Sequence, residues 1–430
     1  MNFPASIVAA FKHKKIECAI FILMALAPTI HLAFGDWNDT VFNAISFLSL
    51  LGIYLDKTAK PFNRRQNAIF LLLFISYPAA IFISQLARWQ WRIHDYLDQG
   101  RFLLAIPVFI YLAKKNFNYK KQLEIFLPLA LIASYFATKY LYRDVQYGTD
   151  RLANNFIDVV GYGQICISMS LVILAMVERN DSKGVFFTFW KILGLAFGVL
   201  ISIETQSRTG WFSILGVIAF LLWINREHIK GKSFALLFFL IIGASYVLFN
   251  EIHIIHQRLF EAYLELKNYP WSGGVAPYGS VSLRITFFRI GWFYFTHSPW
   301  YGWGEKGFVG LMNSPELLAF ASKYAIDYSY VRLFHNELVT QMVRYGMLGV
   351  LGYIMVFVVT TAKLASLLNH PSEVVRSNAI LAIVFLLTQI FSGMSDQVIN
   401  LKHAVMFFSL LMAGFLGSIA SELRSKHSRI

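Results

Sequence analysis

Long uncharged apolar runs recur along this chain, and they constrain its fold more than any other feature. The clearest runs are Cys18 to Ala33, Ala68 to Leu86, Val185 to Ile203, Gly210 to Ile224 and Ala379 to Met394. A bilayer core needs about 20 apolar residues in a helix, and without water a spanning segment has to be a helix or part of a closed barrel. The runs are too long and too continuously apolar for barrel strands. The sequence therefore predicts an all-α, polytopic membrane protein.

The composition agrees with this fold class, since 57% of the 430 residues are hydrophobic and only 14% are charged, against about 25% in a typical soluble domain. We expect one integral membrane domain over 1–430, and the missing small-residue cleavage site indicates a retained first span. About twelve transmembrane helices are predicted, over 16–34, 41–55, 67–86, 101–113, 123–140, 158–177, 186–203, 209–225, 233–250, 336–362, 377–394 and 401–421.

The positive charge of the chain is concentrated in alternate loops between these spans. Lys and Arg cluster at 12–15, 57–65, 114–121 and 226–232 and near the C-terminus, which places both termini in the cytoplasm by the positive-inside rule. The net charge of +14 then needs no nucleic-acid partner. We expect membrane lipids, and no nucleic acid, around this protein.

One long polar segment, residues 251–335, lies between the ninth and tenth predicted spans on the opposite, outer side. We expect a helix over 251–268 that extends the ninth span, turns over 271–279, and an amphipathic, aromatic-rich helix over 281–297 in the plane of the membrane interface. A chain that keeps this many polar residues between two spans is predicted to carry its chemistry there.

Three arginines are candidates for binding an anion. Arg208 lies in a tight outer turn between two apolar spans, where an arginine is costly unless it is paired or faces water. Interfacial snorkelling is the alternative. Arg284 and Arg289 lie on the aromatic stretch and are equally compatible with lipid headgroups. Arg284 is the stronger candidate because free backbone N–H groups near a helix start also favour anions.

His335 is the candidate proton acceptor, because an imidazole is suited to take up a proton near neutral pH. It is followed by Asn336 and Glu337 at the start of the tenth span. A purely structural histidine is the alternative, and Glu337 is a candidate cap of that helix. Asp396, on the same side, has three possible roles: orienting His335, pairing with an arginine, or capping the last helix.

Motifs for metal or nucleotide chemistry are missing from the sequence. Cys18 and Cys166 have no metal-ligand spacing, no paired carboxylates stand out, and neither a Walker loop nor a GxGxxG fingerprint occurs. We therefore predict no metal and no cofactor. Arginines can neutralise an anionic leaving group instead. Trp271, Trp300, Tyr301 and Trp303 suit sugar rings, although an interfacial aromatic belt explains them almost as well. Group transfer from a lipid pyrophosphate carrier follows as a hypothesis.

Several short motifs, in this order, resemble the bacterial O-antigen ligase and polymerase superfamily. They are Thr205-Gln206-Ser207-Arg208, Ser282-Leu283-Arg284, Ser298-Pro299-Trp300-Tyr301-Gly302-Trp303-Gly304, His335-Asn336-Glu337, Gly346-Met347-Leu348-Gly349 and Gly393-Met394-Ser395-Asp396. The last is similar to the ligase branch. The resemblance runs from about residue 150 to the C-terminus and implies a GT-C-like helical glycosyltransferase with short helices in its periplasmic loop.

The ligase branch implies a metal-independent, inverting transfer of O-antigen from undecaprenyl pyrophosphate to lipid A–core. It takes place at the periplasmic face of the Gram-negative inner membrane, where it completes lipopolysaccharide. By position, Arg208 and Arg284 would bind the pyrophosphate and His335 would activate the acceptor hydroxyl. Further substrate-binding candidates are Arg289, Arg332, Asp396 and Trp303.

Three alternatives stay open. An O-antigen polymerase shares the donor chemistry, and an O-linked protein glycosyltransferase belongs to the same superfamily. A transporter of lipid-linked sugars is less favoured, because such proteins usually show internal repeats and polar groups at the midplane of the membrane. Here the charged candidates lie at one face.

Overall fold

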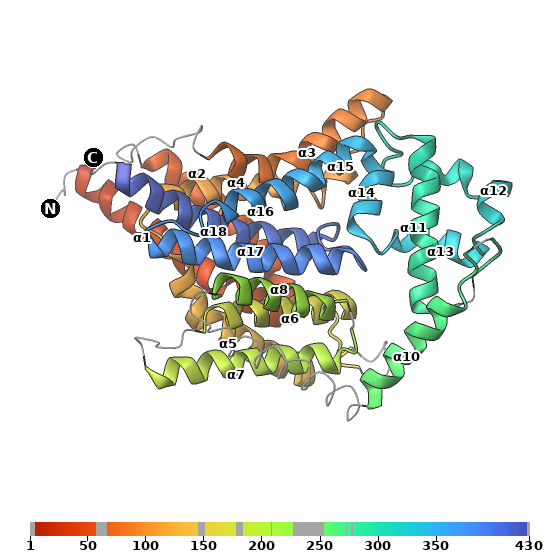
Figure 1. Cartoon of the computed structure of the whole chain (residues 1–430). Coiled ribbons are helices and arrows are strands. Elements are labelled where there is room, and N and C mark those ends of the chain that lie inside the picture. The colour runs from red at the N-terminus through yellow and green to blue at the C-terminus, as the bar shows by residue number, and fades with distance from the viewer. Residues whose placement is uncertain are drawn as a thin grey trace. The chain divides into compact units, whose positions relative to one another are not determined.

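The computed structural model describes residues 5–56, 67–144, 151–177, 184–207, 209–226, 253–271, 273–276 and 278–427. Within these ranges every regular element is a helix (Figure 1), so the predicted all-α fold class is confirmed. The chain divides into two compact units. The first comprises Met1–Ile214, Leu351–Ser392 and Val398–Ile430, and the second comprises Leu215–Val350 and Gly393–Gln397.

The first unit is built mainly from long apolar helices. They are α1 (Ala5–Ala33), α2 (Asn38–Leu55), α3 (Ala68–Arg88), α4 (Arg101–Lys114), α5 (Tyr119–Tyr140), α6 (Val159–Ala175), α7 (Val185–Glu204), α16 (Thr360–Ala365), α17 (Glu373–Gly393) and α18 (Lys402–His427). A π-helical stretch, Ile354–Val359, joins α15 (Met347–Tyr353) to α16. Helices α15 and α8 (Trp211–Ile224) each pass from one unit into the other.

Seven helical segments in the described residues are long and apolar enough to cross a membrane. They are Lys14–Ala33, Ala68–Arg88, Tyr119–Tyr140, Val185–Glu204, Met347–Ala365, Glu373–Gly393 and Lys402–Ser425. Helices α6 and α8 are shorter but also apolar. The chain is thus a polytopic membrane protein. The predicted spans over 41–55 and 101–113 are helices as well, and α4 continues through Pro107. The predicted ninth span, 233–250, lies outside the described residues.

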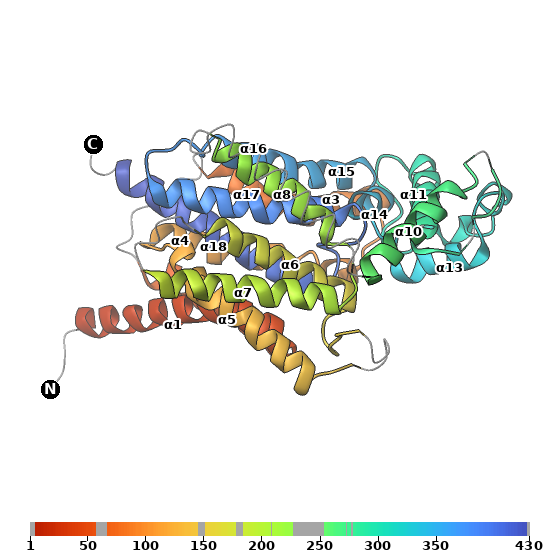
Figure 2. The same ribbon diagram turned by 60° about the horizontal axis from the view of Figure 1, so that its bottom comes forward.

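Helix α18 forms the core of the first unit. It packs along α4 and also contacts α1, α2 and α5, while α1 packs along α5 (Figure 2). Two glycines on α18 allow the close approach: a Cβ on Gly414 would lie 2.4 Å from the ring of Tyr119, and one on Gly417 would lie 2.6 Å from Cβ of Leu112. Small residues at helix contacts are the usual basis of packing in membranes, where burial away from water adds little.

The second unit contains the described part of the polar segment. Its elements are α10 (His253–Lys267), α11 (Ser280–His297), the 3₁₀ helix η3 (Gly307–Leu311), α12 (Pro315–Leu318), α13 (Lys323–Arg332) and α14 (Glu337–Tyr345). The predicted helices over 251–268 and 281–297 are therefore confirmed as α10 and α11. Helix α11 contacts α10, α13 and α14, and residues 268–279 connect α10 to α11.

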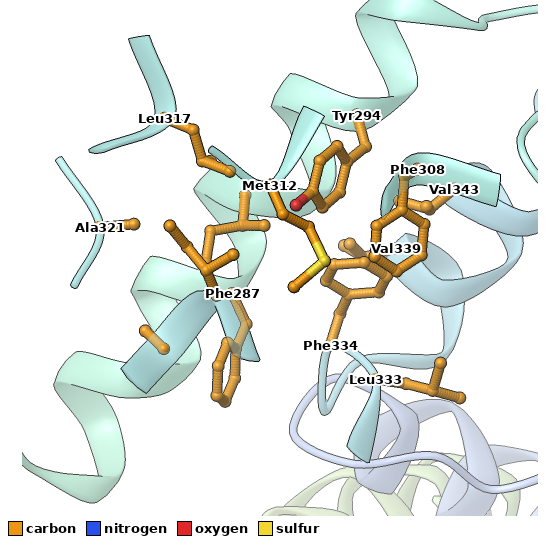
Figure 3. Packing of buried hydrophobic residues seen from close by; sticks show 13 residues of the cluster. Phe287, Tyr294, Phe308, Met312, Leu317, Ala321, Leu333, Phe334, Val339 and Val343 are labelled. Atoms are coloured by element: carbon orange, nitrogen blue, oxygen red, sulfur yellow. The ribbon is translucent and has the colours of Figure 1, made fainter. Parts of the chain in front are cut away.

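A buried apolar cluster holds these short helices together (Figure 3). Helix α11 contributes Phe287, Ile290 and Tyr294, which recur at helical spacing along one face, and α14 contributes Val339 and Val343. The other members come from the connections and short helices: Phe308, Met312, Leu317, Ala321, Ala325, Ile326, Leu333 and Phe334. This polar segment is consequently a folded unit with its own core.

The tenth predicted span, 336–362, differs from the structure because the helix breaks at Gly346. That residue has φ +61°, and a Cβ there would lie 2.6 Å from the carbonyl oxygen of Pro299. The membrane-spanning segment starts only at Met347, whereas α14 packs against α11. A left-handed glycine at a helix end is the standard device for such a break. The sequence pattern alone did not reveal it.

The tryptophan-rich motif over 298–304 has a structural role at this break. The backbone N–H groups of Trp303 and Gly304 donate to the last carbonyls of α14, at Val343 (2.9 Å) and Arg344 (2.8 Å). The N–H of Met347 donates to Pro299 at 2.7 Å. These bonds satisfy helix-end groups that would otherwise be buried without partners. They fix the end of α14 against the motif.

Candidate active site

His335 lies in a strained turn between α13 and α14. Leu333 has φ +63° and His335 has φ +44°, both in the left-handed region that residues with a side chain rarely adopt. Neighbouring contacts enforce the strain: Phe334 is buried in the apolar cluster, and Asn336 caps α14 by accepting from the N–H of Val339 at 3.0 Å. Strain of this kind, of order 1–3 kcal/mol per residue, clusters at functional sites.

A short loop after α17 gathers the candidate residues. Three consecutive residues each bind a different partner: the Met394 carbonyl accepts from Asn336 Nδ2 (3.0 Å), and the Ser395 carbonyl accepts from Arg284 Nε (2.9 Å). Asp396 Oδ1 lies 3.0 Å from His335 Nδ1. We call Met394–Asp396 the clamp loop. It brings Arg284, His335 and Asp396 together within the second unit.

The contact with Asp396 determines which nitrogen of His335 is available. A carboxylate accepts from Nδ1–H, which leaves the lone pair on Nε2 in the neutral imidazole. Among the described residues Nε2 has no hydrogen-bond partner. The side chains of His335 and Asp396 are 21% and 13% exposed, so the pair is partly shielded and still accessible. Such an arrangement suits a general base that is oriented by a carboxylate.

Two of the three guanidinium nitrogens hold Arg284 in place. Nε donates to the clamp loop, and Nη1 donates to the carbonyl of Ser280 at 3.1 Å and to the Ser280 hydroxyl. Within the described part of the chain, Nη2 donates to no acceptor. A fixed guanidinium whose Nη2 has no acceptor can bind a phosphate oxygen without reorganising.

The sequence led us to expect free backbone N–H groups at the start of α11. Two of these N–H groups are already bound. Oε2 of Glu265, on α10, accepts from the backbone N–H groups of Val281 (2.6 Å) and Ser282 (3.0 Å). A carboxylate from another helix therefore occupies the anion site, and that expectation was wrong. The guanidinium of Arg284 remains the positive group at this end of α11.

Two aromatic rings pack around His335. Its ring lies 5.7 Å from the ring of Phe287 and 5.7 Å from that of Tyr328, with interplanar angles of 25° and 23°. Phe287 and Tyr328 lie 5.6 Å apart with an angle of 12°. The three nearly parallel rings restrict rotation of the imidazole, so the geometry set by Asp396 is retained.

Two further candidates make other contacts. The Arg289 guanidinium lies 4.5 Å over the ring of Phe320 and donates to the Tyr269 hydroxyl at 3.5 Å. Trp303 donates from its indole N–H to the Tyr294 carbonyl at 2.8 Å and packs against the apolar cluster. Burial, aided by the charge of Asp327, raises the pKa of Tyr294, so its phenol stays protonated. Both sets of contacts stabilise the unit.

Of the remaining candidates, the structure describes Asp396 and Glu337 but not the side chains of Arg208 and Arg332. Arg208 and the side chain of Arg332, which ends α13, lie outside the described residues. Asp396 does not cap the last helix, since α18 begins six residues later at Lys402. Glu337 is fully buried and accepts from Gln341 Nε2 at 2.8 Å, whereas Asn336 provides the cap of α14.

The roles of Glu265 and of the Ser395 carbonyl were not predicted. A backbone carbonyl leaves no signal in the sequence. Glu265 is an ordinary helical glutamate, and only the pairing of α10 with α11 brings it to the α11 N-terminus. Among the described residues, no group of three or more His, Cys, Asp or Glu side chains gathers as metal ligands do. Among the described residues of the site, Arg284 supplies the positive charge.

The comparison with known families covers the centre of the chain. Residues 193–354 match the family model for O-antigen ligase. The resemblance to the O-antigen ligase and polymerase superfamily, inferred from the motifs, is confirmed. No curated protein matches the chain. The matched segment includes Arg208, Arg284 and His335, whereas Asp396, which binds His335, lies beyond it.

Proposed function

We propose that this protein is an O-antigen ligase. It moves O-antigen polysaccharide from undecaprenyl pyrophosphate to a sugar hydroxyl of lipid A–core and thereby completes lipopolysaccharide. The match of residues 193–354 to the family model for O-antigen ligase supports chemistry on lipid-linked polysaccharides. The single observation that carries the proposal is the clamp loop, which holds an arginine and a carboxylate-bound histidine side by side.

His335 is the general base in this reaction. The acceptor hydroxyl approaches Nε2, which takes its proton while the oxygen attacks the anomeric carbon of the donor. Asp396 holds the tautomer that accepts at Nε2 and stabilises the imidazolium that forms. A positioned base of this type contributes about 10²–10⁴-fold to the rate.

Arg284 stabilises the leaving group. As the new glycosidic bond forms, the bond from the anomeric carbon to the phosphate oxygen breaks, and undecaprenyl pyrophosphate departs with an added negative charge. The Nη2 group of Arg284 is suited to donate to that oxygen. Attack and departure on opposite faces of the sugar invert the anomeric centre. The positive charge comes from arginine, so we expect activity to persist in a chelator.

The family resemblance assigns Arg208 to the pyrophosphate as well. Its part in the proposal rests on the sequence, because it lies outside the described residues. The described residues before it form a well-anchored turn: Thr205 is fully buried, and its carbonyl accepts from Arg151 Nε at 2.9 Å. We expect the loss of Arg208 to slow transfer.

The proposed location is the inner membrane of a Gram-negative bacterium, with both termini cytoplasmic and the second unit in the periplasm. The alternation of Lys and Arg between loops supports this orientation. A cysteine introduced at exposed Lys267 tests it. A membrane-impermeant maleimide should label that cysteine in intact cells whose outer membrane has been permeabilised.

Complementation of a ligase-deficient Gram-negative host, carrying the cognate donor and core, tests the function. We expect wild type to restore the lipopolysaccharide ladder, and Arg284→Ala and His335→Ala to lose it at matched membrane levels. If wild type gives no ladder while polymerised donor accumulates on undecaprenyl pyrophosphate, the ligase proposal fails. If instead wild type lengthens short donor chains in a polymerase-deficient host, the protein is a polymerase.

A further inference from the structure

A line of tyrosine rings leads from the surface of the second unit to His335. The ring of Tyr278 lies 5.4 Å from that of Tyr324, which lies 5.8 Å from that of Tyr328. Tyr328 in turn lies 5.7 Å from the imidazole of His335. Each ring thus touches the next, and the last ring in the series is the proposed base.

Packing in the apolar cluster does not explain the two outer tyrosines, Tyr278 and Tyr324, because both are exposed. Tyr328 packs partly against the apolar cluster, but Tyr324 is 48% exposed and Tyr278 is 73% exposed. Tyr324 and Tyr328 are four residues apart on α13, so they share one face of that helix. Tyr278 comes from the connection just before α11. Single exposed aromatic residues are common on protein surfaces and need no explanation, but here two exposed rings are in contact with each other and continue to a third ring beside the proposed base.

The chemistry of this row fits a chain of sugars. A pyranose ring presents C–H groups on its faces, which pack on aromatic rings, and hydroxyl groups at its edge. A phenol offers both an apolar face and a hydroxyl that donates and accepts hydrogen bonds. Polar partners also flank the row, because Lys323 and Asp327 pair at 3.2 Å on α13 and are each 54% exposed.

We propose that Tyr278, Tyr324 and Tyr328 form the subsite that binds the acceptor oligosaccharide. This inference rests on the proposed function. A general base touches the hydroxyl that it deprotonates, and this hydroxyl belongs to the acceptor. The sugar beside His335 is therefore the terminal sugar of the acceptor, and the tyrosine row that continues from His335 holds the sugars that precede it.

Kinetics of the purified full-length protein test the subsite, with donor and acceptor varied separately. Tyr324→Leu and Tyr278→Leu should each raise the KM for the acceptor about 3- to 10-fold, as expected for one lost ring contact. They should leave the KM for the donor and kcat within about twofold. Tyr324→Phe, which keeps the ring but loses the hydroxyl, should raise the acceptor KM less than Tyr324→Leu does.

Tyr263→Leu is the matched control, because Tyr263 is 57% exposed on α10 and lies outside the row. It should leave both KM values unchanged. An acceptor KM that stays constant in Tyr324→Leu and Tyr278→Leu overturns the inference. A rise confined to the donor KM also overturns it, since the row would then bind the donor glycan.

Direct binding separates this inference from the proposed function. The probe is the deacylated core oligosaccharide of the host, titrated calorimetrically into wild type, Tyr324→Leu and Tyr263→Leu. We expect binding to wild type and Tyr263→Leu, and about 3- to 10-fold weaker binding to Tyr324→Leu. Equal binding to all three contradicts the subsite. Absence of glycan transfer by wild type, with this binding difference intact, contradicts the ligase function alone.

Discussion

Nδ1 of His335 lies 3.0 Å from Oδ1 of Asp396, a residue 61 positions further along the chain. The same carboxylate oxygen accepts from the backbone N–H of Gln397 at 2.8 Å, which fixes its position. A base that is oriented in this way keeps one tautomer and one direction of approach for its substrate. The mechanism proposed above depends on this relationship and on the arginine bound by the preceding residue.

Asp396→Asn should reduce kcat by about 10²-fold, because the amide can present its NH₂ group to Nδ1 and stabilise the wrong tautomer. The KM for the donor should change little. Steady-state kinetics of the purified protein, with donor and acceptor varied separately, measure both parameters. Glu316→Gln, at an exposed glutamate of α12, is the control for removing a carboxylate on the same unit, and a matching loss there would contradict a specific role for Asp396.

Arg284→Lys should not rescue Arg284→Ala. Arg284 binds the clamp loop through Nε and leaves Nη2 for the substrate, and an ammonium group cannot do both. Both variants should lose about 10²-fold or more in kcat. The assay is glycan transfer by purified protein at saturating donor. Lys267→Ala removes an exposed cation from α10 for comparison and should be active. Near-normal activity of Arg284→Lys would show that only a positive charge is needed.

Glu265→Ala should destabilise the second unit by about 0.5–2 kcal/mol, the usual cost of losing a helix N-cap. Because α11 also carries Arg284, transfer should slow as well. Glu265→Gln keeps an oxygen acceptor and should recover most of the stability. Thermal unfolding and kcat measured on the same preparations test the two effects. A loss of stability with unchanged kcat would show that Arg284 is positioned without this cap.

Gly346→Ala should be strongly destabilising, because φ +61° disfavours a side chain and its Cβ would meet the backbone of Pro299 and Trp300. We expect a cost above about 1 kcal/mol. Gly310→Ala is the matched control, since a Cβ there has nothing within 4 Å. Fluorescence-detected size exclusion of heated samples compares the two. Equal stability would contradict the packing described for the α14–α15 break.

The fold class was predictable because apolar runs and loop charges are local features. The break at Gly346 was not, since it depends on the backbone of residues 299–300, which approaches only in the folded chain. The expectation of free N–H groups at the α11 N-terminus was wrong for the same reason. Glu265, from another helix, accepts hydrogen bonds from the N–H groups that we expected to bind a ligand.

Most of the candidate site was predicted by residue type and sequence order, but its geometry was not. His335, Arg284 and Asp396 are chemically distinctive groups in short motifs. Among three possible roles for Asp396, only the folded structure selects the contact with His335. The tyrosine row was not predicted, because the spacing of Tyr278, Tyr324 and Tyr328 in the sequence forms no recognisable motif. Their rings come into contact only in the folded chain.

The most direct test is a double-mutant cycle on transfer by the purified protein. His335→Ala, Asp396→Asn and the double variant are compared with wild type under single-turnover conditions. If Asp396 acts through His335, we expect the double variant to be no slower than His335→Ala. Losses that multiply would mean that the two residues act independently, and the proposed base would lose its main structural support.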